Sequence, residues 1–273
     1  MSADIASNGA RQRMLAGRRA LVTGSSGGLG YAIAEGLAQA GCSMVLHGLD
    51  LPDQVAVQQQ ALRLRHGIDV AYIRSDLSQA GGALELMRRA RAELGPVDIL
   101  VNNAVVRHFA PIDEFPPEAW DRALAVNVSA AFHLVRETLP DMRARRWGRI
   151  VNLTSVYGER GTVNRVDYVT TKSALIGFTR AVAMETLNDG ITCNAVSPGS
   201  VLTPGTQARV EQIRKEQDLP SADAERRFLA GKQPSGRFVR PDDVAAAVTF
   251  LCSDAARDIT GIVLPVDGGW LAS

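Results

Sequence analysis

The chain has 273 residues, of which 46% are hydrophobic and 22% are charged, a length and composition that allow one α/β domain with a substantial core. Its formal net charge of +1 provides no field that would gather nucleic acid or an anionic membrane surface, so we expect neither partner. The three cysteines lie far apart in apolar runs without the spacing of metal ligands. They indicate buried reduced thiols, no metal site and a reducing, cytoplasmic compartment.

The opening segment, residues 1–16, lacks the apolar stretch that a secretory signal requires. Its arginines and serines faintly resemble an organelle transit peptide, but a flexible N-terminal tail is the favoured interpretation. No apolar run in the sequence reaches the length of a membrane-spanning helix. We therefore expect a tail followed by a single dinucleotide-binding catalytic domain over residues 17–273.

Short β-branched runs alternate along the chain with longer segments of helical period, the pattern of repeated βαβ units. Such units form a parallel sheet with helices on both faces, so we predict a Rossmann-type, doubly wound α/β fold with seven strands. The predicted strands are Ala20–Thr23, Met44–His47, Ala71–Ile73, Ile99–Asn102, Ile150–Leu153, Thr192–Val196 and Ile262–Val266. Amphipathic helices are predicted at Tyr31–Ala40 and Ala83–Leu94.

One segment departs from this alternation. From about residue 203 to residue 240 the chain is highly charged and helix-prone, and a clear helix start follows at Pro241-Asp242-Asp243. Long excursions from an α/β core are often functional, which favours a helical substrate lid over residues 203–240. The alternative is a solvated surface insertion.

A glycine-rich segment, Thr23–Gly30, lies between the first predicted strand and a helical pattern. At such a strand-to-helix turn the backbone can approach a pyrophosphate, and the helix N-terminus favours its negative charge. Gly24, Gly28 and Gly30 have the spacing of a dinucleotide-binding fingerprint. A simple tight turn is the alternative interpretation.

The end of the second strand, Leu46–Asp50, bears on the choice between NAD and NADP, because this strand reaches the adenosine ribose. No arginine or lysine stands there or in the glycine turn to pair with a 2′-phosphate, and Asp50 would repel one. We therefore predict NAD as the cofactor, with NADP less favoured. Asp50 is displaced from the usual place of such a carboxylate, where Gly48 stands instead, so Asp50 could equally be a turn residue.

Tyr168 and Lys172 have the i, i+4 spacing that puts a phenol and an ammonium on one helix face. The pair suits alcohol oxidation, because a nearby cation lowers the pKa of a phenol, ordinarily about 10, toward neutrality. Ser155 follows an apolar strand, so its hydroxyl would lie at a carboxyl end of the sheet, where open α/β folds bind ligands. Asn127 is a polar residue in an apolar helical pattern and requires a partner, either a water chain or a neighbouring helix that it pins.

Taken together, these motifs resemble the short-chain dehydrogenase/reductase family over nearly the whole chain, from about Gly17 to Trp270. The resemblance is carried by the glycine turn, Asp76-Leu77, Asn102-Asn103-Ala104, Asn127, Ser155, Tyr168, Lys172 and Ser197-Pro198-Gly199. It implies that Tyr168 is the general acid/base, that Lys172 lowers its pKa and holds the nicotinamide ribose, that Ser155 orients the substrate oxygen, and that Asn127 anchors a relay water.

The same resemblance implies a cofactor site and an assembly. Asp76 would contact adenine, Thr203 would contact the nicotinamide amide, and the long helices would form a homotetramer. Val105 stands where the family usually has glycine and would add bulk near the cofactor ribose. The full set of expected cofactor-binding residues is Gly24, Ser26, Gly28, Leu29, Gly30, Leu49, Asp76, Leu77, Asn103, Ala104, Tyr168, Lys172, Pro198, Gly199, Val201 and Thr203.

Within the family, the segments at His108, Glu114-Phe115-Pro116 and Val266-Asp267-Gly268-Gly269-Trp270 resemble those of bacterial D-3-hydroxybutyrate dehydrogenases, but the positions that bind a carboxylate in those enzymes have changed. Arginines can clamp anionic groups bidentately, and Ser200 replaces a bulky tryptophan. We therefore expect an anionic hydroxy acid larger or more highly charged than 3-hydroxybutyrate. The expected substrate-binding residues are Arg107, Ser155, Tyr157, Arg165 and Arg209. The alternative is that these arginines are surface residues on loops.

Two other functions stay open on the sequence. A 3-oxoacyl-thioester reductase that acts on acyl carrier protein shares these catalytic residues but normally uses NADPH, which the missing basic residue disfavours. A non-catalytic NAD-binding sensor or scaffold has no need of a complete Asn–Ser–Tyr–Lys set.

Overall fold

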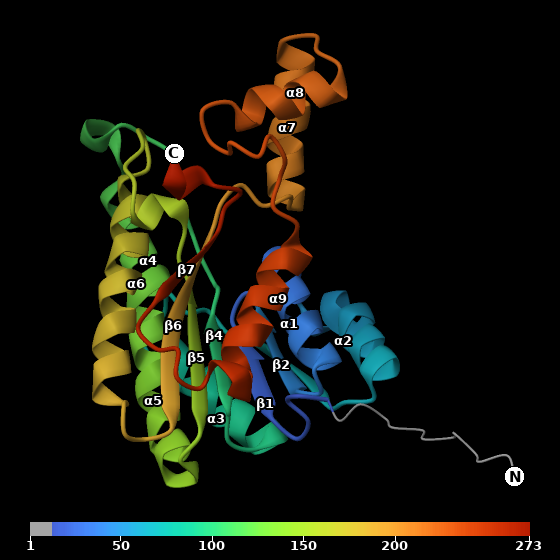
Figure 1. Ribbon diagram of the computed structural model, residues 1–273, viewed down its shortest axis with the longest axis vertical. Helices are drawn as coiled ribbons and strands as arrows, with labels where there is room; N and C mark the ends of the chain where they lie inside the picture. The colour runs from blue at the N-terminus through green and yellow to red at the C-terminus, as the bar shows by residue number, and fades with distance from the viewer. Residues whose placement is uncertain (1–12) are drawn as a thin grey trace, which may run out of the picture.

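The computed structural model describes residues 13–273 and contains a seven-stranded, wholly parallel sheet in the order β3-β2-β1-β4-β5-β6-β7 (Figure 1). The predicted Rossmann-type fold is confirmed, and every predicted strand falls within about two residues of an observed one. The strands are β1 (Arg19–Val22), β2 (Ser43–Gly48), β3 (Val70–Arg74), β4 (Ile99–Asn102), β5 (Gly148–Leu153), β6 (Ile191–Pro198) and β7 (Val263–Val266).

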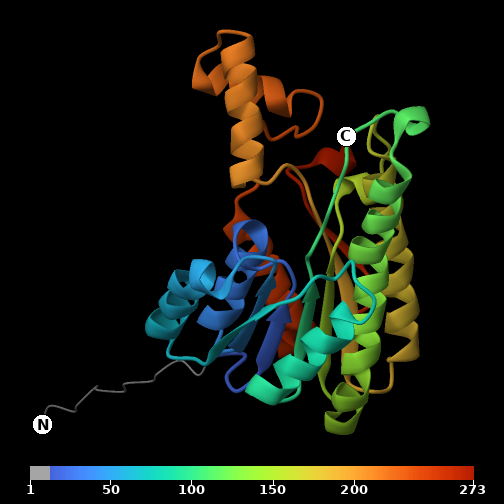
Figure 2. The ribbon, with the colours of Figure 1, turned by 180° about the vertical axis from the view of Figure 1, so that it is seen from behind.

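Helices cover both faces of the sheet (Figures 1 and 2). Successive side chains of a strand point to opposite faces, so Val22 of β1 packs in one apolar cluster and Leu21 in the other. The first cluster receives α1 (Gly28–Gln39), α2 (Pro52–His66) and α9 (Pro241–Cys252). The second receives α3 (Gly82–Leu94), α5 (Ala130–Arg145) and α6 (Val166–Glu185), and α4 (Pro117–Leu124) leads into α5.

The strand order reverses beside β1, which pairs with β2 on one side and with β4 on the other. Connections from neighbouring strands diverge at such a point and leave a crevice at their carboxyl ends. The turn after β1 and the loop after β4 therefore border a natural ligand site.

The folded part of the chain begins earlier than the sequence predicts. Leu15, which we assign to the tail from the sequence, is only 2% exposed and packs in the first apolar cluster. Its backbone N–H donates to the Ala40 carbonyl at 2.9 Å. The domain boundary at residue 17 is thus wrong by a few residues, because one apolar side chain in a polar segment gave no periodic signal. The rest of the expected tail, residues 1–12, lies outside the described residues.

The excursion at residues 203–240 forms two helices, α7 (Pro204–Glu216) and α8 (Ser221–Leu229), which stand above the carboxyl end of the sheet (Figures 1 and 2). Val210 and Leu229 are buried, and Val201 bridges to Val239 at the base of the excursion. The helix start predicted at Pro241 is confirmed. Within residues 13–273, no helix is both long and apolar enough to cross a membrane.

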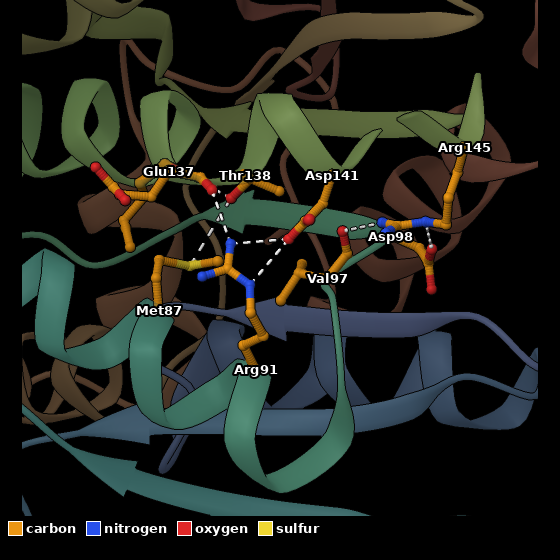
Figure 3. Close-up of polar contacts among 9 residues, drawn as sticks. Met87, Arg91, Val97, Asp98, Glu137, Thr138, Asp141 and Arg145 are labelled. Carbon is orange, nitrogen blue, oxygen red and sulfur yellow. Dashed lines mark hydrogen bonds and ion pairs between the residues drawn. The ribbon is translucent and has the colours of Figure 1, made fainter. Parts of the chain in front are cut away.

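Polar contacts hold the sheet to α5 on the side away from the crevice (Figure 3). Asp98, which precedes β4, is 1% exposed and lies 3.1 Å from Arg145 Nε and 3.0 Å from Arg19 Nε. Arg91 of α3 pairs with Asp141 of α5 at 2.8 Å. These contacts stabilise the framework that carries the site.

Candidate active site

The glycine turn after β1 has a backbone that side chains would obstruct. Gly24 has a φ of +63°, and a Cβ on Gly30 would lie 2.1 Å from the Gly24 carbonyl oxygen. Thr23 Oγ1 accepts hydrogen bonds from the Asn103 and Ala104 amides, both at 2.9 Å, and the Asn103 side chain donates to the Gly24 carbonyl. The turn is thereby locked to the loop after β4, with the N-terminus of α1 facing the crevice.

His47 holds the same turn from β2, a role that the sequence analysis missed. The Gly24 amide donates to His47 Nδ1 at 3.1 Å, and His47 Nε2 lies 3.0 Å from the Ser75 carbonyl, which fixes the tautomer protonated at Nε2. Burial lowers the pKa of His47 to about 4, so the ring is neutral near pH 7. The three segments that meet at His47 are far apart in sequence, and only the fold brings them together.

A cavity of about 660 Å³ lies at the carboxyl ends of the strands. It brings together eleven of the expected cofactor-binding residues, namely Gly24, Leu29, Gly30, Asn103, Ala104, Tyr168, Lys172, Pro198, Gly199, Val201 and Thr203. A dinucleotide fits these residues, because the glycine turn offers bare backbone and a helix N-terminus to a pyrophosphate. Val105, which we expect near the cofactor ribose, also lines the cavity.

Five expected cofactor-binding residues do not line this cavity: Ser26, Gly28, Leu49, Asp76 and Leu77. The Asp76 carboxylate accepts hydrogen bonds from the backbone and hydroxyl of Ser78, and these bonds lower its pKa. Asp76 therefore closes a local turn, Leu77 is buried, and Leu49 is exposed. The Ser26 hydroxyl occupies the space beside Gly48, 2.7 Å from where a Cβ on that glycine would lie.

A basic residue that the sequence analysis did not find stands beside the end of β2. Arg74 is paired in register with Gly48 of the neighbouring strand, and its Nε donates to the Leu49 carbonyl at 2.8 Å. Burial and Asp50 raise the pKa of Tyr72, whereas Arg74 lowers it, so both charges lie close to that phenol. The ends of adjacent parallel strands lie side by side, so an arginine at the end of the predicted third strand is the sequence signal for this cation.

Tyr168 and Lys172 lie in the first turns of α6, at the wall of the cavity. Tyr168 is 9% exposed, and Lys172 Nζ lies 5.6 Å from the centre of the Tyr168 ring. The ammonium donates to the Leu153 carbonyl of β5 at 2.5 Å. Burial lowers the pKa of Lys172 to about 7, and the charge of Arg107 acts in the same direction.

Ser155 follows β5, as expected, and caps the short 3₁₀ helix Val156–Gly158. Its hydroxyl accepts from the Tyr157 amide at 3.3 Å and lines the cavity with Tyr168 and Lys172. The Tyr157 ring meets Tyr168 and Trp270 edge-on, with ring centres 6.4 and 5.3 Å apart. A hydroxyl and a phenol thus share one wall of the cavity beside a buried ammonium.

The Asn127 side chain lies behind that wall and ties the loop after β4 to α6. Its Oδ1 accepts from the Val106 amide, and its Nδ2 donates to the Val106 carbonyl and to Thr171 Oγ1. These bonds satisfy the buried amide and favour the pinning interpretation for the side chain. Asn127 lies in a π-helical turn, Ala125–Ser129, a local widening that often marks functional sites.

Asp167, immediately before Tyr168, is a second buried polar residue that the sequence analysis missed. Its carboxylate accepts from the Tyr168 amide at 2.6 Å and from the His108 amide at 2.9 Å. The start of α6 is therefore joined to the same loop that Asn127 holds. Without knowledge of the partner loop, an aspartate at a helix start indicates only a helix N-terminus.

The five expected substrate-binding residues, Arg107, Ser155, Tyr157, Arg165 and Arg209, all line the cavity. Arg165 is half-buried, and both Arg165 and Arg209 lie over the Phe109 ring, with guanidinium carbons 4.7 and 4.8 Å from its centre. The structure adds Lys232 to this group. The arginines therefore line the cavity, although Arg107, on the loop after β4, and Arg209, on α7, are also exposed.

Comparison with known proteins bears on this arrangement. The family model described as enoyl-(acyl carrier protein) reductase matches residues 24–271. D-beta-hydroxybutyrate dehydrogenase of Cupriavidus necator is 42% identical over 259 residues, covering 95% of this chain and 100% of that protein. Acetoacetyl-CoA reductase of Allochromatium vinosum is 33% identical and covers 92% and 98%, respectively. The solved structure of L-sorbose reductase from Gluconobacter frateurii, complexed with NADPH and L-sorbose, superposes with a TM-score of 0.91 at 31% identity, covering 96% of this chain and 99% of that one.

The fold and the site define a dinucleotide-dependent oxidoreductase that acts on CH–OH groups. The chain belongs to the short-chain dehydrogenase/reductase family, and it interconverts an alcohol and a ketone with a nicotinamide cofactor.

Proposed function

We propose that the protein interconverts a secondary alcohol and a ketone in an anionic hydroxy acid larger than 3-hydroxybutyrate, with NAD(H) as the preferred cofactor. One observation carries this proposal. A single cavity is lined at once by the glycine turn, by Ser155, Tyr168 and Lys172, and by three arginines. The similarity to D-beta-hydroxybutyrate dehydrogenase at 42% identity supports a hydroxy acid.

In this proposal, side chains of α6 and of the segment after β5 carry out the proton transfer. The Tyr168 phenol gives a proton to the carbonyl oxygen, or takes one from the alcohol, while the Ser155 hydroxyl donates a hydrogen bond to the same oxygen. Lys172 stabilises the phenolate of Tyr168 and can supply a proton near neutrality, because its pKa is lowered to about 7. The nicotinamide cofactor, when bound, supplies or accepts the hydride.

The preference for NAD rests on the end of β2. Asp50 would repel a 2′-phosphate, and neither the glycine turn nor the end of β2 carries a cation. Arg74 of β3 works in the opposite direction, so we expect a preference for NAD rather than exclusion of NADP. Tyr168, Lys172 and the glycine turn would hold the cofactor in either case.

The variant Tyr168→Phe tests the catalytic assignment. Removing the phenolic oxygen should lower kcat at least about 100-fold, because general acid–base catalysis typically contributes that much, while NADH binding followed by fluorescence stays near that of the wild type. Tyr31→Phe is the matched control: Tyr31 lies on α1, and within residues 13–273 its hydroxyl makes one long hydrogen bond, to the Gln58 carbonyl at 3.5 Å. Wild-type turnover by the Tyr168 variant would overturn the assignment.

A second candidate is reduction of a 3-oxoacyl thioester, favoured by the similarity to acetoacetyl-CoA reductase. It uses the same side chains and predicts a preference for NADPH and for acetoacetyl-CoA over every free acid. The absence of a cation at the end of β2 argues against it.

A further inference from the structure

Besides Lys172, four cationic side chains line the cavity that contains Tyr168. Arg107 lies on the loop after β4, Arg165 at the start of α6, Arg209 on α7 and Lys232 after α8. Among the described residues that line the cavity there is no aspartate or glutamate. Two other cations of α7, Arg214 and Lys215, instead form ion pairs with Glu211.

Arg165 is held in place but lacks a hydrogen-bonding partner for one donor. Its guanidinium carbon lies 4.5 Å from the centre of the Tyr168 ring, 4.7 Å from that of Phe109 and 5.1 Å from that of Tyr157. Its Nε is buried and has no hydrogen-bond partner within residues 13–273. Aromatic faces order a guanidinium but leave its in-plane donors free, and a buried free donor is costly. An anion in the cavity would accept from the other donors of this guanidinium and offset its charge.

The cations extend across the cavity rather than gathering at one point. The Arg107 charge reaches Lys172, whose pKa it lowers in addition to the larger effect of burial. Burial, followed by the charges of Arg209 and Arg165, lowers the pKa of Lys232. Burial is the main cause that lowers the pKa of Arg165, and the charges of Arg107 and Arg209 act in the same direction. Arg107 therefore lies on the side of Lys172, Lys232 lies on the side of α7 and α8, and Arg165 lies between them.

We propose that the substrate is a dianionic hydroxy acid, with one carboxylate held by Arg107 and Arg165 and a second anionic group held by Arg209 and Lys232. This proposal rests on the alcohol–ketone function proposed above. A single carboxylate would leave three of the four positive charges, in a partly buried site, without a counter-charge. Two anionic groups, separated along the molecule, provide one anion for each pair of cations and match their spread.

A matched series of substrates distinguishes the effect of the substrate's charge on kcat/KM from the effect of its size. 3-Hydroxyglutarate is 3-hydroxybutyrate with one added carboxylate, and its monomethyl ester keeps the length but removes that charge. We expect kcat/KM for 3-hydroxyglutarate to exceed the values for both monoanions at least about tenfold, and the advantage to shrink as salt screens the charges. 4-Phospho-3-hydroxybutyrate then shows whether the second anionic group is a carboxylate or a phosphate. Equal or higher kcat/KM for a monoanion or for acetoacetyl-CoA would overturn the proposal.

A binding measurement without turnover separates this proposal from the proposed function. Glutarate, which has no hydroxyl to oxidise, should raise the melting temperature of the cofactor-free protein more than butyrate does. Lys232→Gln should reduce that difference, whereas the matched control Lys215→Gln, on the outer part of α7, should keep it. If glutarate is preferred but no hydroxy acid or ketone is turned over with either cofactor, the dianion site stands and the proposed function fails. If 3-hydroxybutyrate is turned over and glutarate shows no advantage, the dianion site alone fails.

Discussion

Arg74 lies at the end of β3, next to the residues of β2 that usually decide between NAD and NADP. Its Nε is engaged by the Leu49 carbonyl, while the rest of the guanidinium is exposed near Asp50. A positive charge here would contribute to NADPH binding and would matter little for NADH, which has no 2′-phosphate.

We therefore expect Arg74→Gln to weaken NADPH binding about tenfold, the value of one charge-assisted hydrogen bond, and to change NADH binding by no more than about twofold. Fluorescence titration with each cofactor gives both dissociation constants. Arg88→Gln, an exposed arginine on α3 that pairs with Glu85, is the control. Equal loss of affinity for both cofactors would show that Arg74 acts on the fold rather than on the phosphate.

The residues that the sequence analysis missed share one property. His47, Arg74 and Asp167 each bond to a partner from another part of the chain, and Lys232 joins the other cavity residues only through the placement of the excursion at residues 203–240. Motif spacing finds side chains that lie close together along one element, such as Tyr168 and Lys172. It cannot find contacts that depend on how separate elements meet.

At the scale of elements, the strands follow from hydrophobic patterning, because a strand buried on both faces leaves a distinctive apolar run. The excursion at residues 203–240 could be recognised as helical and charged, but the positions of α7 and α8 above the cavity could not. Their few buried apolar residues, such as Val210 and Leu229, do not specify a docking direction. Placing Arg209 in the cavity from sequence therefore depended on family resemblance.

The junction of the glycine turn with β2 and β3 should be sensitive to acid. The pKa of His47 is lowered to about 4, from an unfolded value near 6.5, so between these values the unfolded chain binds a proton that the folded chain does not. The free energy of unfolding should thus fall as the pH drops from about 6.5 to 4, by up to about 1.4 kcal/mol per pH unit from this group.

The variant His47→Gln should remove this contribution. It should be less stable than the wild type at pH 7.5, by about 1–2 kcal/mol for the lost hydrogen bonds, and the gap should narrow at pH 5. Urea unfolding at several pH values measures the difference, with the exposed His133→Gln on α5 as control. A difference in unfolding free energy between the two proteins that does not change with pH would contradict a buried neutral imidazole at this junction.

At the scale of the whole molecule, we propose that the protein is a homotetramer assembled through its long helices. α5 has 16 residues and α6 has 20, and the two run along one side of the molecule (Figure 1). Large apolar side chains are exposed on them, Phe132 on α5 at 48% and Met184 on α6 at 69%. Large apolar side chains left exposed on surface helices are typical of an interface.

Light scattering after size exclusion should give a mass about four times that of the 29.2 kDa chain. Phe132→Asp should shift the protein toward smaller species, because it places a charge in the contact. Leu64→Asp on α2, where the native side chain is 77% exposed, should leave the mass unchanged. A monomeric wild type at micromolar concentration would contradict the proposal.

The two ends of the described chain lie in very different surroundings. Leu15 packs beside Ala40 in the framework, whereas Trp270, three residues before Ser273, packs on Tyr157 in the cavity wall, and its carbonyl accepts from Arg160. A surface linker attached beside Trp270 would therefore lie against the cavity wall that Trp270 and Tyr157 form. Attachment near Leu15 would keep the linker in the framework, away from that wall, which makes it the better choice for immobilising the enzyme or coupling it to a cofactor-recycling partner.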